Sequence, residues 1–210
     1  MKAIKYLFLL FCLVGTQVMA QRGTEEYKAL NSPPEEDKYH IFFKGKHVGT
    51  YDVKKEQEGT RTIYTSLSES SIKVFGTITV TYKLKSVYQG NKLIESHVIA
   101  YRNGKVTDDT KTVWKGNAYE IIYNGDKLTY SEPITRSSIV MYFEPPVNRD
   151  KVYSERDGAV KTASSSGSNS FVLKDDDGNV GSTFFYKNNR IDRVEVPFVM
   201  GQFTIKHNAQ

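Results

Sequence analysis

The fold is decided by residues 78–85, which read ITVTYKLK. Apolar residues occupy the even positions of this run, and threonine or lysine occupies the odd ones. Successive side chains of a β-strand point to opposite faces of a sheet. The run therefore predicts a strand with one buried face and one wet face, as in an antiparallel sheet that is covered on one side.

Turn signals divide the chain on both sides of this strand. Asn103-Gly104 is the strongest of them, because both residues accept the positive φ angles of a two-residue hairpin turn. Glycines at positions 90, 104, 116 and 125 recur in the rhythm of sequential hairpins. We therefore expect a mainly β protein of about ten to twelve strands, either a single curved antiparallel meander sheet or a partly open β-barrel.

The alternation breaks between residues 135 and 146. Residues 135–138 (TRSS) offer a helix cap, an apolar run follows over 139–143, and Pro145-Pro146 ends it. This order predicts one short helix near residues 137–143, of about two turns, with an extended strand as the alternative. Residues 161–170 read KTASSSGSNS, a composition typical of a loop or a weak edge strand.

The first 20 residues have the pattern of a secretory signal peptide. Lys2 and Lys5 precede an apolar run at residues 6–14, and Val18 and Ala20 occupy the positions that a signal peptidase reads. We expect cleavage after Ala20 and export to the periplasm or the extracellular space. No later apolar run is long enough to cross a bilayer as a helix, so we expect no transmembrane anchor after leader removal.

Three segments follow from these patterns. Residues 1–20 are the signal peptide, and residues 21–37 form a polar N-terminal arm that carries Pro33-Pro34 among acidic residues. Residues 38–207 form a single β-rich domain, a size that can bury a core without disulfide bonds.

Charge and cysteine content exclude several classes of function. The 29 Lys and Arg residues face 24 Asp and Glu residues and are interleaved with them, so no basic stripe for nucleic acid exists. The single cysteine, Cys12, lies in the leader, which leaves the mature chain without a disulfide or a cysteine nucleophile. Lipid attachment at Cys12 is disfavoured, because Phe11 stands where a small residue is needed.

No catalytic or metal-binding pattern stands out. The four histidines, His40, His47, His97 and His207, lack the spacing of metal ligands, and we expect His97 to be packed or hydrogen-bonded. The acids at 175–177 are consecutive, which predicts a tight turn and not a calcium loop. We therefore expect no enzyme, metal or cofactor. A deep pocket that joins His47 or His97 to a carboxylate would reopen the enzyme hypothesis.

Aromatic residues make up 12% of the chain, and the simplest interpretation is that they pack the inner face of the sheet. The sharper hypothesis is a concave cleft that binds a lipid or another apolar small molecule, with residues 141–143 near its mouth. The candidate binding residues are Tyr82, Trp114, Tyr123, Met141 and Phe143. The alternative is a structural or envelope-assembly protein that binds an envelope protein through its sheet edges or the 21–37 arm.

Four motifs carry a family resemblance: KGKHVGT at 44–50, YRNGK at 101–105, MYFEPP at 141–146 and VYSERDG at 152–158. With them, the chain from Tyr39 to His207 resembles a family of exported β-rich proteins of Bacteroidetes that is catalogued as a domain of unknown function. The resemblance implies export and a single domain with a curved antiparallel sheet. It implies no catalytic or ligand-binding residues.

Overall fold

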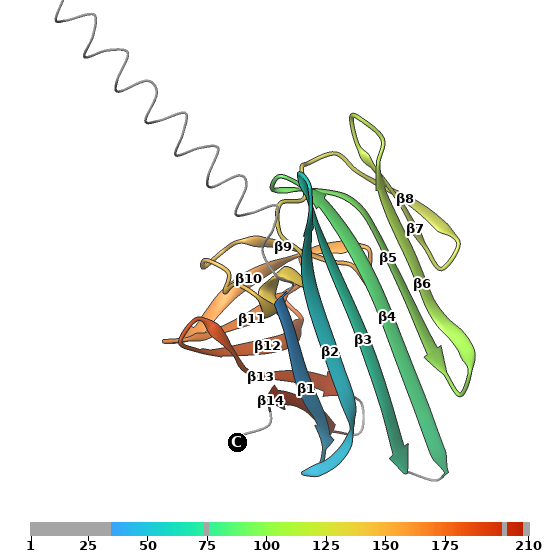
Figure 1. The fold of residues 1–210 in the computed structure, drawn as a ribbon, viewed down its shortest axis with the longest axis vertical. Helices are drawn as coiled ribbons and strands as arrows, with labels where there is room; N and C mark the ends of the chain where they lie inside the picture. Colours follow the sequence, from blue (N-terminus) through green and yellow to red (C-terminus); the bar gives the residue numbers. More distant parts are fainter. Residues whose placement is uncertain (1–34, 74–75, 199–200, 208–210) are drawn as a thin grey trace, which may run out of the picture.

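The first and the last strands pair with each other, and this pairing defines the fold. β1 (Glu35–Phe43) lies antiparallel to β14 (Gly201–His207), with Tyr39 opposite His207. On the β1 side of this pair the strands follow in chain order from β2 to β8, and on the β14 side they follow in reverse order from β13 to β9. β8 and β9 are therefore its two edges, and the sheet is an open meander of fourteen strands (Figure 1).

The computed structural model describes residues 35–73, 76–198 and 201–207. Long strands make up most of the first half of the sheet: β2 (Lys46–Glu58), β3 (Arg61–Lys73), β4 (Thr77–Gln89), β5 (Lys92–Arg102) and β6 (Lys105–Trp114). Two strands of five residues end this half, β7 (Tyr119–Tyr123) and β8 (Asp126–Tyr130). Mostly shorter strands follow: β9 (Lys151–Ser154), β10 (Ala159–Gly167), β11 (Ser170–Lys174), β12 (Val180–Lys187) and β13 (Arg190–Phe198). Figure 1 shows β9–β14 running across the direction of the long strands.

The connection between the two edges folds into the hollow of the sheet. We call this segment, residues 131–150, the plug. It contains one 3₁₀ turn, η1 (Val140–Tyr142), and its apolar side chains Ile134, Ile139 and Met141 are almost completely buried. The hydroxyl of Tyr186 donates to the carbonyl oxygen of Met141 at 2.9 Å, which ties the plug to β12. The core of the protein is thus made by the inner face of the sheet and the plug together.

Side chains, and not strand pairing, bring the two ends of the sheet together around the plug. Tyr153 in β9 and Thr112 in β6 share a hydrogen bond of 2.5 Å between their hydroxyls. The hydroxyl of Tyr88 in β4 donates to Ser137 of the plug at 2.7 Å. Backbone bonds join residues 136–138 to Tyr153, so the plug also covers the edge at β9. The result is a curled sheet that remains open between β8 and β9.

The expected fold class is confirmed: the described part of the chain is almost entirely β, with one antiparallel sheet that does not close. The short helix expected near 137–143 is a single 3₁₀ turn and not two turns. Pro145 cannot continue a helix, and it disfavours helical backbone at Glu144 before it. The β-branched pair Ile139-Val140 also has low helix propensity.

Three sequence expectations about strands need correction, the first being their number, which is fourteen in the described residues and not ten to twelve. Residues 161–170 were expected to form a loop or a weak edge strand, but 161–167 belong to β10, which lies between β9 and β11. Its Ala163 is fully buried, where a small side chain suits the close packing. Residues 35–37 of the expected arm belong to β1, since Glu35 and Glu36 pair with Lys55 and Lys54 across the ladder. Residues 1–34, including the leader, lie outside the described residues.

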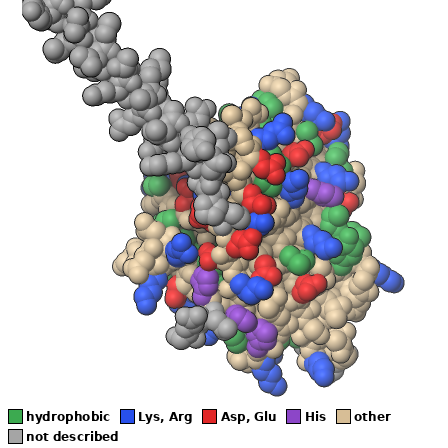
Figure 2. All heavy atoms as spheres, in the orientation of Figure 1, with side chains coloured by type: hydrophobic (Ala, Val, Ile, Leu, Met, Phe, Trp, Pro, Cys, Tyr) green, Lys and Arg blue, Asp and Glu red, His purple; other side chains and the backbone are tan. Residues whose placement is uncertain are grey.

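The outer face of the sheet is polar. Figure 2 shows Lys and Arg interleaved with Asp and Glu on the face that it displays. Several of these charges pair across neighbouring strands, as Lys54 does with Glu36 at 3.3 Å. No helix among the described residues is long and apolar enough to span a membrane.

Candidate functional site

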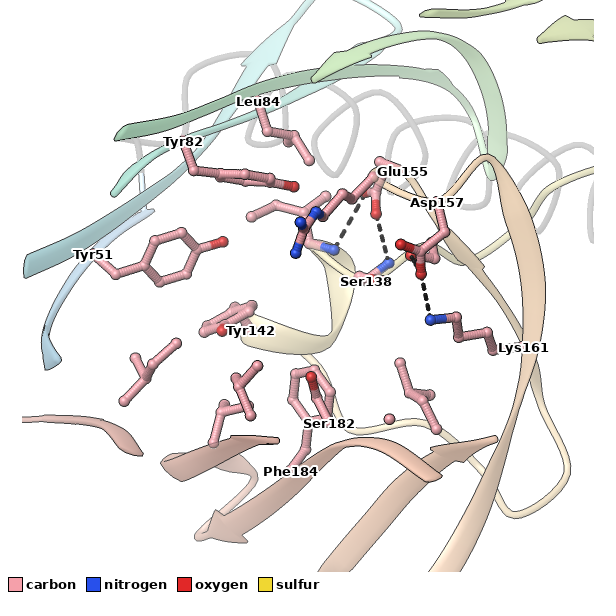
Figure 3. A pocket seen from close by; sticks show the side chains of 18 of the residues that line it. Tyr51, Tyr82, Leu84, Ser138, Tyr142, Glu155, Asp157, Lys161, Ser182 and Phe184 are labelled. Atoms are coloured by element: carbon pink, nitrogen blue, oxygen red, sulfur yellow. Dashed lines mark hydrogen bonds and ion pairs between the residues drawn. The ribbon is translucent and has the colours of Figure 1, made fainter. Parts of the chain in front are cut away.

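A cavity of about 430 Å³ lies beside the plug, between the long strands and the short ones. We call it the inner cavity. Figure 3 shows Tyr51 and Tyr82 entering it from the long strands, Phe184 from β12, and Tyr142 from the plug between them. Its other apolar lining residues are Leu84, Ile139, Leu173, Val180, Val194, Val196, Pro197 and Ile205. Pockets that bind small molecules typically have volumes of roughly 300–1,000 Å³ and predominantly apolar walls.

One wall of the inner cavity is polar and comes from the tight turn between β9 and β10. Ser154, Glu155, Arg156 and Asp157 line the cavity from this turn. Gly158 closes the turn at φ +65°, a backbone conformation that side chains rarely adopt. A Cβ atom at this position would also approach Ile121 to 3.0 Å, so the close packing of the turn against β7 needs a glycine.

Glu155 is the most unusual group of this wall, because its side chain is buried with 1% exposure and has no cation partner within the described residues. Its carboxylate accepts backbone N–H groups of Ser138 at 3.0 Å and Ile139 at 3.3 Å, at the start of the 3₁₀ turn. Burial raises the pKa of Glu155, and the hydrogen bonds from Ser137 and the plug backbone offset only part of this effect. The carboxyl therefore orients the plug and places a proton-binding group beside the cavity.

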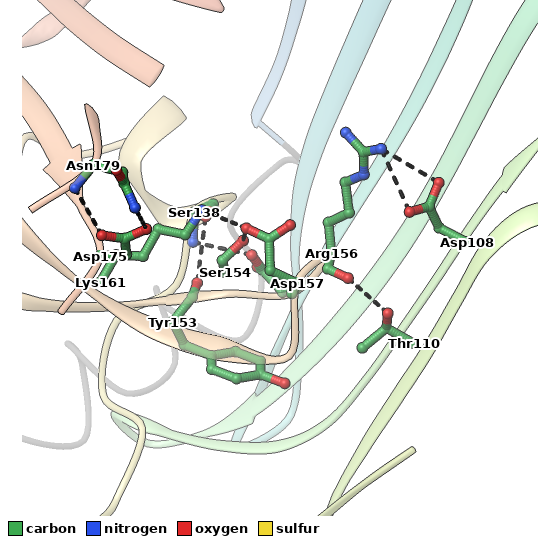
Figure 4. Close-up of polar contacts among 11 residues, drawn as sticks. Asp108, Thr110, Ser138, Tyr153, Ser154, Arg156, Asp157, Lys161, Asp175 and Asn179 are labelled. Atoms are coloured by element: carbon green, nitrogen blue, oxygen red, sulfur yellow. Dashed lines mark hydrogen bonds and ion pairs between the residues drawn. The ribbon is translucent and has the colours of Figure 1, made fainter. Parts of the chain in front are cut away.

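The remaining charges of the polar wall are paired (Figure 4). Lys161 forms an ion pair with Asp157, which also accepts a hydrogen bond from Ser154. Burial alone would raise the pKa of Asp157, but the Lys161 and Ser154 contacts outweigh it and lower that pKa. Arg156 reaches Asp108 at 3.3 Å, and its carbonyl oxygen accepts from Thr110 at 2.7 Å, so the turn is fastened to β6.

This arrangement is suited to holding an amphipathic molecule. Aromatic and aliphatic side chains on facing strands offer apolar contact, while hydroxyl and charged groups on one wall offer hydrogen bonds. The histidines lie outside the lining, and His97 instead bonds to Asp109 at 2.9 Å on the outer face. The expected hydrogen-bonded His97 is confirmed, and no described histidine joins a carboxylate in the inner cavity.

The five residues predicted to bind a ligand do not form one cluster. Tyr82 lines the inner cavity, whereas Met141 is fully buried in the core and not at a cleft mouth. Phe143 packs against Tyr64, with ring centroids 5.4 Å apart. Trp114 packs on Tyr119 at 4.8 Å and carries the ammonium group of Lys92 over its ring. Tyr123 lies in β7 beside Gly158, outside the cavity lining.

Other sequence predictions about chemistry can be placed as well. Asp175 accepts the backbone and side-chain N–H groups of Asn179 at 2.8 and 2.9 Å, which confirms the predicted tight turn. Among the residues that the structure describes, no three His, Cys, Asp or Glu side chains gather as metal ligands.

Glu155 is a cavity residue that the sequence did not single out, and Tyr142 was expected only as part of the 141–143 segment near the mouth of a cleft. Both residues could have been chosen as candidates from the motifs that carry the family resemblance, since Glu155 lies in VYSERDG and Tyr142 in MYFEPP. An acidic residue in a polar turn usually points to solvent, however, and here the plug and Ser86 of β4 enclose its side chain.

Comparison with known proteins places the chain in a family without a known role. Residues 39–208 match the family model described as a domain of unknown function, DUF6134. No curated protein matches the chain. A crystal structure of a β-barrel-like protein of domain of unknown function DUF1849 from Brucella abortus has a similar fold, with a TM-score of 0.53 and 8% sequence identity. The similarity covers 82% of this chain and 95% of that one.

Proposed function

We propose that this chain, which belongs to the DUF6134 family of unknown function, is an exported, non-enzymatic binding module for an apolar or amphipathic molecule. The observation that carries the proposal is the inner cavity itself. The plug fills much of the hollow, yet a space of about 430 Å³ stays open between Tyr82 and Phe184. A domain that needed only a core would gain stability by filling that space.

The lining favours an elongated ligand with one polar end. The apolar contacts come from β2, β4, β11–β14 and the plug, while the charged lining groups all lie in one place, at residues 155–157 and at Lys161 of β10. A chain-like molecule with a hydroxyl or carboxyl group would satisfy both walls. Lipids and their breakdown products have this chemistry, so we expect one of them as the ligand.

A fatty-acid probe tests the proposal. The fluorescence of cis-parinaric acid rises in apolar surroundings, and we expect saturable binding to the wild-type protein. Ser182 lines the cavity from β12, so Ser182→Phe should occupy the space and abolish binding. Thr183→Phe is the matched control, since the next residue of a strand points to the opposite face. Equal binding by both variants, or none by the wild type, would refute the proposal.

Export is a separate part of the proposal, supported by the pattern of residues 1–20. We expect the mature protein to begin at Gln21 and to occur outside the cytoplasm. Mass spectrometry of the protein from fractionated cells checks both points. A cytoplasmic protein that retains Met1–Ala20 would remove export from the proposal without affecting ligand binding.

An envelope-assembly role is the second candidate, favoured by the edge at β8. β8 has no strand partner on its outer side among the described residues, and Leu128 is 44% exposed there. Exposed edges of this kind can pair with a strand of another protein. Cross-linking in the native envelope should then capture a partner that Leu128→Lys releases. The same variant should leave binding of cis-parinaric acid unchanged, which separates the two functions.

A further inference from the structure

The hairpin of β1 and β2 brings two histidines together that are seven residues apart in the chain. Nδ1 of His40 lies 3.0 Å from Nε2 of His47, and the two ring planes meet at 51°. Both side chains are on the outer face, since His40 alternates with the buried residues Tyr39 and Ile41, and His47 lies next to it across the ladder. Figure 2 shows histidine side chains grouped near the lower edge of the face it displays.

A β-bulge creates this arrangement. The register shifts between Ile41 and Phe42, so that Gly49 lies opposite Ile41 and His47 lies opposite Phe42. The extra residue turns the side chain of His47 towards His40. The ring of Phe42 packs edge-on against His47 at 5.6 Å and limits its movement. The pair is therefore held by backbone geometry and packing, not only by the contact between the two rings.

We propose that His40 and His47 form a binding site for one divalent late transition-metal ion, of the class Zn²⁺, Ni²⁺ and Cu²⁺. Metal–nitrogen bonds to histidine are about 2.0–2.1 Å long. Two such ligands of one ion then lie about 2.9–3.4 Å apart, for angles between those of octahedral and tetrahedral geometry. The observed 3.0 Å falls in this range and is also the length of a hydrogen bond between the two rings, so an ion replaces the shared proton once the rings turn to aim both lone pairs at it.

The donor set decides the class of ion. Two imidazole nitrogens suit zinc, nickel and copper, whereas calcium and magnesium require oxygen ligands. The described residues provide no third His, Cys, Asp or Glu at this site. Water or a group of another molecule completes the coordination, and the ion stays accessible from solvent.

A neighbouring lysine opposes the binding. Lys206 in β14 lies directly opposite His40, and its ammonium group is held over the ring of Phe42 at 4.7 Å. Side chains opposite each other on a sheet are close enough for their charges to repel. Removing the Lys206 charge should therefore tighten the binding of a dication. The site is independent of the inner cavity, because none of these residues line that cavity.

Calorimetric titration of the untagged full chain with Ni²⁺ tests the site. We expect one ion per chain in the wild type and a loss of affinity of at least about tenfold in His40→Ala and in His47→Ala, because each removes one arm of a chelate. His97→Ala is the control, since it removes an outer-face histidine that bonds to Asp109 instead, and it should bind as the wild type does. Lys206→Gln should bind more tightly than the wild type.

Nuclear magnetic resonance identifies the ligands directly and does not depend on the variants. Addition of Zn²⁺ should shift the imidazole ¹⁵N resonances of His40 and His47 and leave those of His97 in place. The proposal is overturned if the wild type binds no Ni²⁺, if binding survives both alanine substitutions, or if Zn²⁺ shifts other histidines first.

Discussion

Two regions share the interior of the curled sheet, and they differ in how they are filled. Around Met141 the plug packs against the strands without space, and this side chain is 0% exposed. Between Tyr82 and Phe184 the same sheet leaves an open cavity with one polar wall. The contacts of the first region stabilise the open sheet, and the second region offers space for a ligand. A change in the filled region should therefore cost stability, and a change in the open region should cost binding.

The largest effect is expected in the filled region, from Met141→Ala. Removal of a fully buried methionine leaves a void, which should lower the free energy of unfolding by about 2–5 kcal/mol. Val147→Ala is the control from the same plug, because Val147 is 68% exposed and should change stability by less than about 0.5 kcal/mol. Urea denaturation measures both. Equal losses would mean that the plug does not pack as described.

A hydroxyl that anchors the plug gives the next effect. Tyr119 donates to the carbonyl oxygen of Leu93 at 2.9 Å and accepts the N–H of Ile134 at 3.1 Å, and all three groups are buried. Tyr119→Phe leaves both partners unsatisfied and should cost about 1–3 kcal/mol. Tyr130→Phe removes a hydroxyl that bonds to the exposed Glu132 and should cost clearly less. Thermal unfolding of the two variants gives the comparison, and a larger cost for Tyr130→Phe would contradict it.

Substitution by a larger side chain should lower the free energy of unfolding in the filled region and hardly change it in the open region. Ala163 is fully buried in the filled core, so Ala163→Leu should lose about 1–3 kcal/mol through overpacking. Ser182→Phe adds a larger group but places it in the inner cavity, so its cost should stay below about 1 kcal/mol. The reverse order in denaturant titrations would show that the cavity is closed in solution.

The smallest effect is a pH dependence at Glu155. Its pKa in the folded protein is raised above the unfolded value, because burial disfavours the charged form. The group therefore favours folding most while it is protonated, and this contribution is lost as the pH rises through the folded pKa. The stability of the wild type relative to Glu155→Gln should fall as the pH is raised from about 4 to 8. A pH-independent difference would mean that Glu155 is not buried.

The local parts of this fold could be predicted from the sequence. The alternation at 78–85 appears as β4, and Asn103-Gly104 forms the hairpin turn between β5 and β6 at φ 51° and 76°. These features depend on neighbours in the chain, which a sequence pattern records directly. The pairing of β1 with β14 depends on residues more than 150 positions apart, and no local pattern specifies it.

The functional features were harder to predict for the same reason. Tyr82 was found because its strand shows which face is buried. Glu155 was missed, since its burial results from contact with the plug and with Ser86 of β4, which lie outside its own turn. The His40–His47 pair was missed because spacing along the chain says nothing of a bulge that places them 3.0 Å apart.

The most direct test of the account is to map where an apolar molecule binds. Titration of ¹⁵N-labelled protein with cis-parinaric acid should shift the backbone amide resonances of Tyr82, Ser138 and Ser182, which line the inner cavity on three sides. The amides of His97 and Lys111, in strands β5 and β6 that contribute no residue to the cavity lining, should stay in place. Shifts confined to the outer face or to the edge at β8, or no saturable shifts at all, would contradict a binding site inside the sheet.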